Sequence, residues 1–153
     1  MRIHLKHLVP IVLAAALPLL VACERELVGA EANKVVGLTE STADALIAGL
    51  AEGDYEACAG NFDDFMRRSV PDTCFTDWRN DLDDKLAEYQ SREVHRVAQG
   101  DEFYVVEYLA SFERMDSVMV GIAFHRVEPY AIDHLWIEAG DLSWAPEPSR
   151  QCE

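Results

Sequence analysis

The chain has few basic residues for its acidity. Its 13 Lys and Arg residues stand against 28 Asp and Glu residues, which gives a formal net charge of −15 at pH 7. A surface this acidic repels phosphate backbones and anionic head groups, so nucleic acid is not expected as a partner. No loop has the alternating acidic ligands of an EF-hand, and solubility is the simpler interpretation of the acidity.

The sequence also lacks the short motifs that carry familiar chemistry. It has no G-x-S-x-G turn, no Gly-rich phosphate loop, no C-x-x-C pair and no H-x-H or H-E-x-x-H spacing. Three histidines fall on expected strands, where we interpret them as exposed: His95, His125 and His134. A metal held by His125 and His134 across neighbouring strands is the alternative, but we expect neither a metal nor a cofactor.

No apolar run is long enough to cross a bilayer comfortably as a helix, which takes about 20 residues. The longest run, LVPIVLAAALPLLVA, covers residues 8–22 and follows a start made basic by Arg2 and Lys6. A basic start, a short apolar stretch and small residues at its end are typical of a secretory signal. We therefore expect residues 1–22 to be a signal peptide.

The end of this run, Leu20-Val21-Ala22-Cys23, resembles the lipobox of bacterial lipoproteins. The resemblance implies that the Cys23 thiol receives diacylglycerol, that the chain is cut before Cys23, and that the new amino group is acylated, for example with palmitate. Such anchoring is stable, because each buried CH₂ contributes about 0.8 kcal/mol. An ordinary cleaved signal with a free Cys23 thiol, or an uncleaved membrane helix, is the alternative.

The residue after Cys23 bears on localisation. In Gram-negative lipoproteins an Asp at this place favours retention in the inner membrane, and this chain has Glu24 instead. We therefore expect a lipid-anchored protein of the cell envelope, on the outer membrane and facing the periplasm if the organism is Gram-negative.

Export would place the other three cysteines in an oxidising space, where disulfides persist. Cys58 and Cys74 lie beside apolar residues at the ends of consecutive helical segments, and we expect them to pair. Closing a loop of about 16 residues stabilises the fold by roughly 3 kcal/mol in the chain-entropy model. Cys152 lies in a C-terminal tail, residues 141–153, where we expect it to be unpaired within the chain.

The periodicity of apolar residues divides the rest of the chain. Residues 23–37 are mixed and aperiodic, which predicts a tether, and residues 38–140 read as one domain. Helical spacing occurs over 41–53, 55–68 and 71–89, and a period of two follows over 93–98, 102–114, 116–127 and 130–138. Helices followed by strands predict an α+β fold with a curved antiparallel sheet of about four strands.

The stretch LAEGDYEACAGNFDDFMRRSVPDTCFTDWRNDLDDKLAEYQSREV, residues 50–94, is similar to a bacterial family of small exported domains of unknown function. That family resembles the cone-shaped fold of nuclear transport factor two and the steroid isomerases. The likeness covers residues 43–138 and implies a curled sheet that encloses a pocket with the helices. Cys58 and Cys74 depart from the family pattern.

The expected pocket lining consists of aromatic residues that alternate along two strands: Tyr104, Tyr108, Phe112 and Trp136. A steroid-isomerase-type site would add a carboxylate base and an oxyanion donor, with candidates in Tyr55, Tyr104, Tyr108, Asp133 and His134. No spacing unites these candidates, so we expect no catalytic residues and a non-enzymatic binding or accessory domain. Its partner would be an envelope protein or a small apolar ligand; an isomerase-like enzyme and a protein for surface display are the alternatives.

Overall fold

The computed structural model describes residues 24–140 and 142–145. The expected signal peptide, the lipidation site Cys23 and the tail residue Cys152 lie outside the described residues. Among the described helices, none combines the length and the apolar character that a membrane crossing requires.

Four helices and six strands make up this part of the chain. The helices are α1 (Gly29–Glu52), α2 (Tyr55–Ala59), α3 (Asp64–Ser69) and α4 (Asp72–Leu86). The strands are β1 (Arg25–Leu27), β2 (Tyr89–Gln99), β3 (Phe103–Phe112), β4 (Val118–His125), β5 (Ile132–Ala139) and β6 (Leu142–Trp144). The strands form one antiparallel sheet in the order β1-β2-β3-β4-β5-β6.

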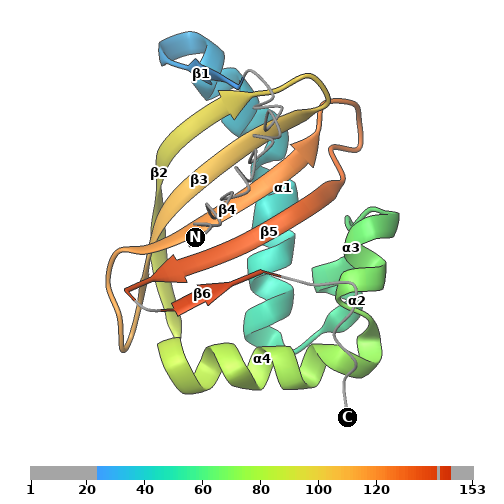
Figure 1. Cartoon of the computed structure of the whole chain (residues 1–153), viewed down its shortest axis with the longest axis vertical. Helices are drawn as coiled ribbons and strands as arrows, with labels where there is room; N and C mark the ends of the chain where they lie inside the picture. The colour runs from blue at the N-terminus through green and yellow to red at the C-terminus, as the bar shows by residue number, and fades with distance from the viewer. Residues whose placement is uncertain (1–23, 141, 146–153) are drawn as a thin grey trace, which may run out of the picture.

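The α+β class is confirmed, with helices on one face of an antiparallel sheet. Helix α1 runs behind the sheet and α4 crosses at its lower end, in the view of Figure 1. The sheet has six strands instead of about four. The two strands that were not predicted, β1 and β6, are each only three residues long. Segments this short carry no readable alternation, so periodicity could not reveal them.

The predicted tether over residues 23–37 is wrong for the part that the structure describes. Strand β1 pairs with β2, and α1 begins at Gly29, so both elements belong to the folded domain. Leu27 and Val35 are buried in the main core, with 4% and 3% of their surface exposed. Part of the predicted tail, too, is strand β6, which pairs with β5.

The helix expected over residues 55–68 is two helices with an extended segment between them. Asp54 caps α2 by accepting from the Ala57 amide at 3.1 Å, and Asp63 caps α3 by accepting from the Met66 amide at 2.8 Å. Between the caps, Phe62 forms a parallel bridge with Ile132 on β5. This bridge fixes the short helices to the edge of the sheet.

The two faces of the sheet have separate apolar clusters. Alternate residues of β3 point toward the helices, as the period of two predicts: Tyr104, Val106, Tyr108, Ala110 and Phe112. The other face has a small cluster of Ala98, Val105 and Ala123, against which Phe103 and Trp136 pack. The main core therefore lies between the helices and one face of the sheet.

The expected Cys58–Cys74 disulfide is wrong, because Cys58 is a buried free thiol. Cys58 packs directly on α1: a Cβ built at Gly49 would lie 2.7 Å from the Cys58 Cβ atom. The side chain is thus part of the contact between α1 and α2. Cys74 is disulfide-bonded, but not to Cys58.

Candidate functional site

A cavity of about 160 Å³ lies between α1, α4 and the helix-facing side of the sheet. Its walls are mainly apolar, and come from α1 (Leu46, Ile47, Leu50, Ala51), α4 (Leu82, Leu86) and the strands (Tyr108, Ala110, Phe112, Val120, Leu135, Ile137). The amphipathic pattern of both helices produces this lining, because each presents its leucines to the sheet.

The size of the cavity limits what it can hold. A cavity of about 150 Å³ accepts a molecule such as benzene, whereas sites for drug-sized ligands measure roughly 300–1,000 Å³. The cavity of about 160 Å³ in this chain fits a single small ring or a short aliphatic chain. A steroid-sized ligand does not fit in this conformation.

One buried polar group lies in the wall of the cavity. The Tyr108 hydroxyl has no hydrogen-bond partner among the described residues, and only 3% of the residue is exposed. Desolvation raises the pKa of Tyr108, so the hydroxyl keeps its proton at neutral pH. The hydroxyl oxygen has almost no accessible surface, so a ligand in the cavity does not reach it in this conformation.

Arg92 stands beside this tyrosine at the edge of the cavity. Its guanidinium carbon lies 5.0 Å from the centre of the Tyr108 ring, a cation–π contact. It also donates to the Tyr89 hydroxyl at 3.5 Å and forms an ion pair with Asp44 on α1. A positive group therefore adjoins the apolar cavity, although one carboxylate already neutralises it.

The structure brings together two of the four expected lining residues. Tyr108 and Phe112 line the cavity. Tyr104 lies on the same face of β3 but outside the cavity, with the Arg126 guanidinium carbon 5.4 Å from its ring centre. Trp136 is on the opposite face, so its assignment to the pocket is wrong.

The reason for the error at Trp136 is an irregularity between β4 and β5. Ala123 pairs with His134 and Phe124 pairs with Ile132, which leaves Asp133 as an extra residue on β5. Such a bulge shifts the alternation of all residues beyond it. Leu135 and Ile137 consequently face the helices, and Trp136 does not.

The residues proposed for catalysis do not meet in the cavity. Its wall includes two carboxylates, Asp83 and Glu88, and both residues are exposed. Asp133 and His134 are not part of the wall, and the Tyr55 hydroxyl donates to the Val70 carbonyl at 3.0 Å. A carboxylate base in an apolar pocket, which an isomerase of this type needs, is absent from the described wall.

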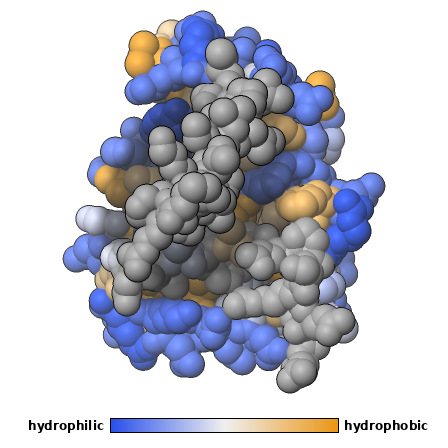
Figure 2. Space-filling view, in the orientation of Figure 1, coloured by the Kyte–Doolittle hydropathy of each residue, from blue (hydrophilic) through white to orange (hydrophobic). Residues whose placement is uncertain are grey.

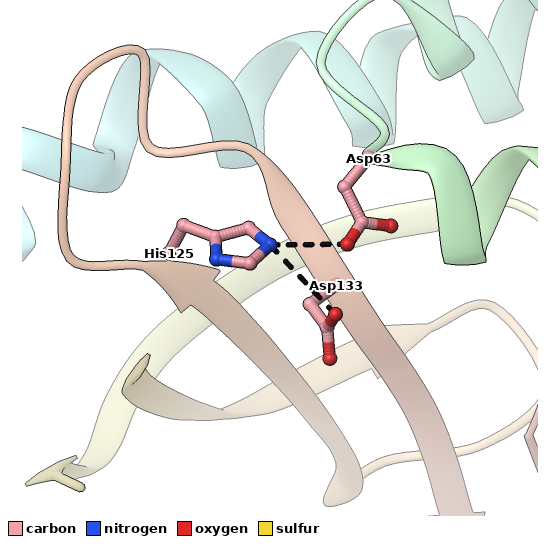
Figure 3. A group of neighbouring side chains, drawn as sticks. All are labelled: Asp63, His125 and Asp133. Atoms are coloured by element: carbon pink, nitrogen blue, oxygen red, sulfur yellow. Dashed lines mark hydrogen bonds and ion pairs between the residues drawn. The ribbon is translucent and has the colours of Figure 1, made fainter. Parts of the chain in front are cut away.

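A second group of polar side chains lies at another edge of the sheet, where Asp63, His125 and Asp133 point toward one another (Figure 3). Asp63 caps α3, His125 ends β4, and Asp133 is the bulged residue of β5. His125 Nε2 lies 3.0 Å from Asp63 Oδ2 and 3.7 Å from Asp133 Oδ1. The bulge therefore re-aims Asp133 toward the histidine.

The two carboxyl groups of this cluster titrate in opposite directions. Burial raises the pKa of Asp133, and its hydrogen bond with Asp63 raises it further. Burial would also raise the pKa of Asp63, but hydrogen bonds from the Met66 amide and from His125 outweigh it and lower that pKa. Asp63 is thus the carboxylate that stays ionised, and Asp133 is the one that takes a proton first.

Sequence reasoning named His125 and Asp133 separately and missed Asp63. The turn before Asp63 could not be predicted from the spacing of residues. Asp63 lies near His125 because the neighbouring Phe62 forms a bridge with β5. The available signal was its role as a helix cap, since "NFDDF" places an Asp just before a helical run.

Comparisons with known proteins add no match: no protein-family model, no curated protein and no solved structure matches this chain. The geometry of the cavity is therefore the basis for the binding function proposed below.

Proposed function

We propose that the mature chain is a lipid-anchored, non-enzymatic binding domain of a bacterial cell envelope, and that it holds a small apolar molecule between its helices and its sheet. The observation that carries the binding proposal is the apolar cavity of about 160 Å³ that α1, α4 and the sheet enclose. The lipobox-like Cys23 supports the anchoring, with the outer membrane facing the periplasm as the proposed location if the organism is Gram-negative.

The cone-like fold is part of this proposal. In the cone fold a curled sheet and its helices enclose a pocket, and this chain places helices on one face of a six-stranded antiparallel sheet. Phe112 and Tyr108 line the cavity at one end of β3, where the sheet meets the C-terminal half of α4.

The walls define the chemistry of the ligand. Leu46, Leu86 and Ile137 offer apolar surface, which favours a ring or a chain of about six carbons at this volume. Arg92, which belongs to the wall beside the Tyr108 ring, favours a ligand with one oxygen acceptor at its end. A short-chain or monocyclic carboxylic acid, ester or aldehyde has this combination.

Native mass spectrometry of protein extracted gently from the envelope tests the proposal. We expect an additional mass on the wild-type chain that is released by organic solvent. The variant Ala110→Leu fills the cavity and should lose that mass, whereas Ala48→Leu adds the same side chain at an exposed position of α1 and should keep it. The same additional mass on all three chains, or on none of them, would contradict binding in the cavity.

The isomerase-like alternative has less support than binding. It requires a buried carboxylate in the cavity, and the two carboxylates in the wall, Asp83 and Glu88, are exposed. No observation on the described residues favours catalysis in the cavity, so binding is the function that we carry forward.

A further inference from the structure

We propose that Asp63, His125 and Asp133 form a binding site for a divalent transition-metal ion, with one ligand atom from each residue. The site lies outside the cavity wall and does not rest on the function proposed for the cavity.

The distances between the ligand atoms suit a metal ion. All three atoms lie within 4.8 Å of one another, and the separations from His125 Nε2 are 3.0 Å to Asp63 and 3.7 Å to Asp133. An ion bound at about 2.0–2.2 Å from nitrogen and oxygen holds neighbouring ligands roughly 3.0–3.5 Å apart. An ion can therefore enter with only small movements of the side chains.

In each carboxylate, the oxygen that does not face His125 already has a hydrogen-bond partner. Asp63 Oδ1 accepts from the Met66 amide at 2.8 Å, which leaves Oδ2 directed at the histidine. Asp133 Oδ2 contacts His134 Nδ1, which leaves Asp133 Oδ1 directed at His125. Secondary contacts of this kind orient metal ligands in known sites.

Backbone hydrogen bonds join the three segments that carry the ligands. The Asp63 amide donates to the Ile132 carbonyl at 2.9 Å, and the Ile132 amide donates to the Asn61 carbonyl at 2.7 Å. The His125 amide donates to the Ala131 carbonyl at 2.8 Å. The fold therefore places the three ligand side chains close together before any ion binds.

The charge of the cluster points to a cation as the missing partner. The side chains of Asp133 and Asp63 are largely buried, with 12% and 17% of their surface exposed, yet their ion pairs within residues 24–140 are with histidines only. Neither carboxylate has a Lys or Arg partner there. Buried carboxylates are normally paired with a cation or bound to a metal, and a divalent ion would supply both positive charges.

The kind of ion follows from the ligands. One imidazole and two carboxylates suit Zn²⁺, Mn²⁺ and related ions, whereas Mg²⁺ and Ca²⁺ prefer sets of oxygen ligands. Because the His125 side chain keeps 34% of its surface exposed, solvent can reach the site and complete the coordination. We commit to Zn²⁺ as the probe.

Isothermal titration of the full chain with Zn²⁺ tests the proposal. We expect one equivalent to bind to the wild type, and the variants His125→Gln, Asp133→Asn and Asp63→Asn to bind at least about tenfold more weakly. The matched control is His95→Gln, which removes an exposed histidine of β2 and should leave the affinity unchanged. Circular dichroism confirms that each variant is folded; Asp63→Asn keeps a good helix cap and so provides a folded variant if another does not fold.

Two results would overturn the metal site. One is the absence of heat from Zn²⁺ binding to the wild type at concentrations up to about 100 μM, the range of weak sites. The other is an affinity that is equal in the wild type, in folded Asp63→Asn and in His95→Gln, which would assign any binding to other groups, such as thiols.

Discussion

Burial controls the chemistry of individual residues in this chain, and Cys58 is the clearest case. Only 1% of the residue is exposed, because its Cβ lies against the backbone of Gly49. Desolvation raises the pKa of the Cys58 thiol to about 12, with a smaller contribution from the negative charge of Asp54. The thiol therefore remains protonated at pH 8, where an exposed cysteine is partly ionised.

We expect Cys58 to resist alkylation in the folded protein and to react once the chain is unfolded. The measurement is iodoacetamide labelling at pH 8 with and without 6 M guanidinium chloride (without reductant), read by peptide mass spectrometry. Because labelling after unfolding requires a free thiol, it also tests the absence of a Cys58–Cys74 bridge. Labelling of Cys58 in the native protein at the rate of a model thiol would contradict its burial.

Gly121 on β4 shows how closely two residues approach on the outer face of the sheet. A Cβ at this position would lie 1.9 Å from Trp136 Cε2, so the tryptophan ring occupies the space that a side chain would need. Gly121→Ala should destabilise the protein by about 1–3 kcal/mol, the usual cost of overpacking.

Urea unfolding of Gly121→Ala and Gly100→Ala measures this effect. Gly100 is the control, since its nearest neighbour is 3.8 Å from an added Cβ. Equal free energies of unfolding for the two variants would contradict the packing of Trp136 on this face.

At the scale of elements, α1 is where sequence and structure differ most. The residues that α1 buries recur at spacings of three and four, but they are mostly small or polar: Val35, Thr39, Thr42, Ala43, Leu46 and Gly49. An apolar stripe is therefore visible only in the second half of the helix. The N-terminal cap, Val28, makes no side-chain hydrogen bond that would have marked the beginning.

Substitutions at Gly37 test whether this segment is helix. Gly37 lies inside α1 with open space around it, so Gly37→Ala should stabilise the protein by up to about 1 kcal/mol and Gly37→Pro should destabilise it by about 3 kcal/mol. The measurement is chemical unfolding followed by circular dichroism. A flexible tether would leave both variants within a few tenths of a kcal/mol of the wild type, and that result would contradict the helix.

The strands were predictable where their alternation is regular. The period of two placed Tyr108 and Phe112 correctly on the helix-facing side of β3, because that strand pairs with β4 without interruption. It failed for Trp136 on β5, because the bulge at Asp133 shifts every later residue to the other face. No residue type in the sequence marks that bulge, and the same bulge creates the acidic cluster.

At the scale of the whole molecule, the position of the first strand determines how far the domain would lie from a lipid anchor. Strand β1 begins at Arg25, immediately after the expected lipidation site and Glu24. A lipid on Cys23 would hold the domain directly at the membrane surface, without the flexible spacer that residues 23–37 were expected to form. The domain would then meet its ligand at the membrane and not at a distance from it.

The anchor itself is tested by Cys23→Ala in the producing cells. We expect the wild type to incorporate labelled palmitate and to sediment with the membrane fraction, and the variant to incorporate none and to remain as unprocessed precursor or soluble protein. Cys58→Ala is the matched control and should be labelled like the wild type. Unchanged palmitate labelling of Cys23→Ala would contradict lipidation at this residue.

The most direct test of binding in the cavity is a methyl-NMR titration with toluene, a ring small enough for about 160 Å³. Saturable shifts are expected for methyl groups of Leu46, Leu86 and Ile137, and the Ala110→Leu variant should lose them while Ala48→Leu retains them. Absence of saturable shifts at these cavity methyls in the wild type, or equal shifts in folded Ala110→Leu, would contradict a ligand pocket between the helices and the sheet.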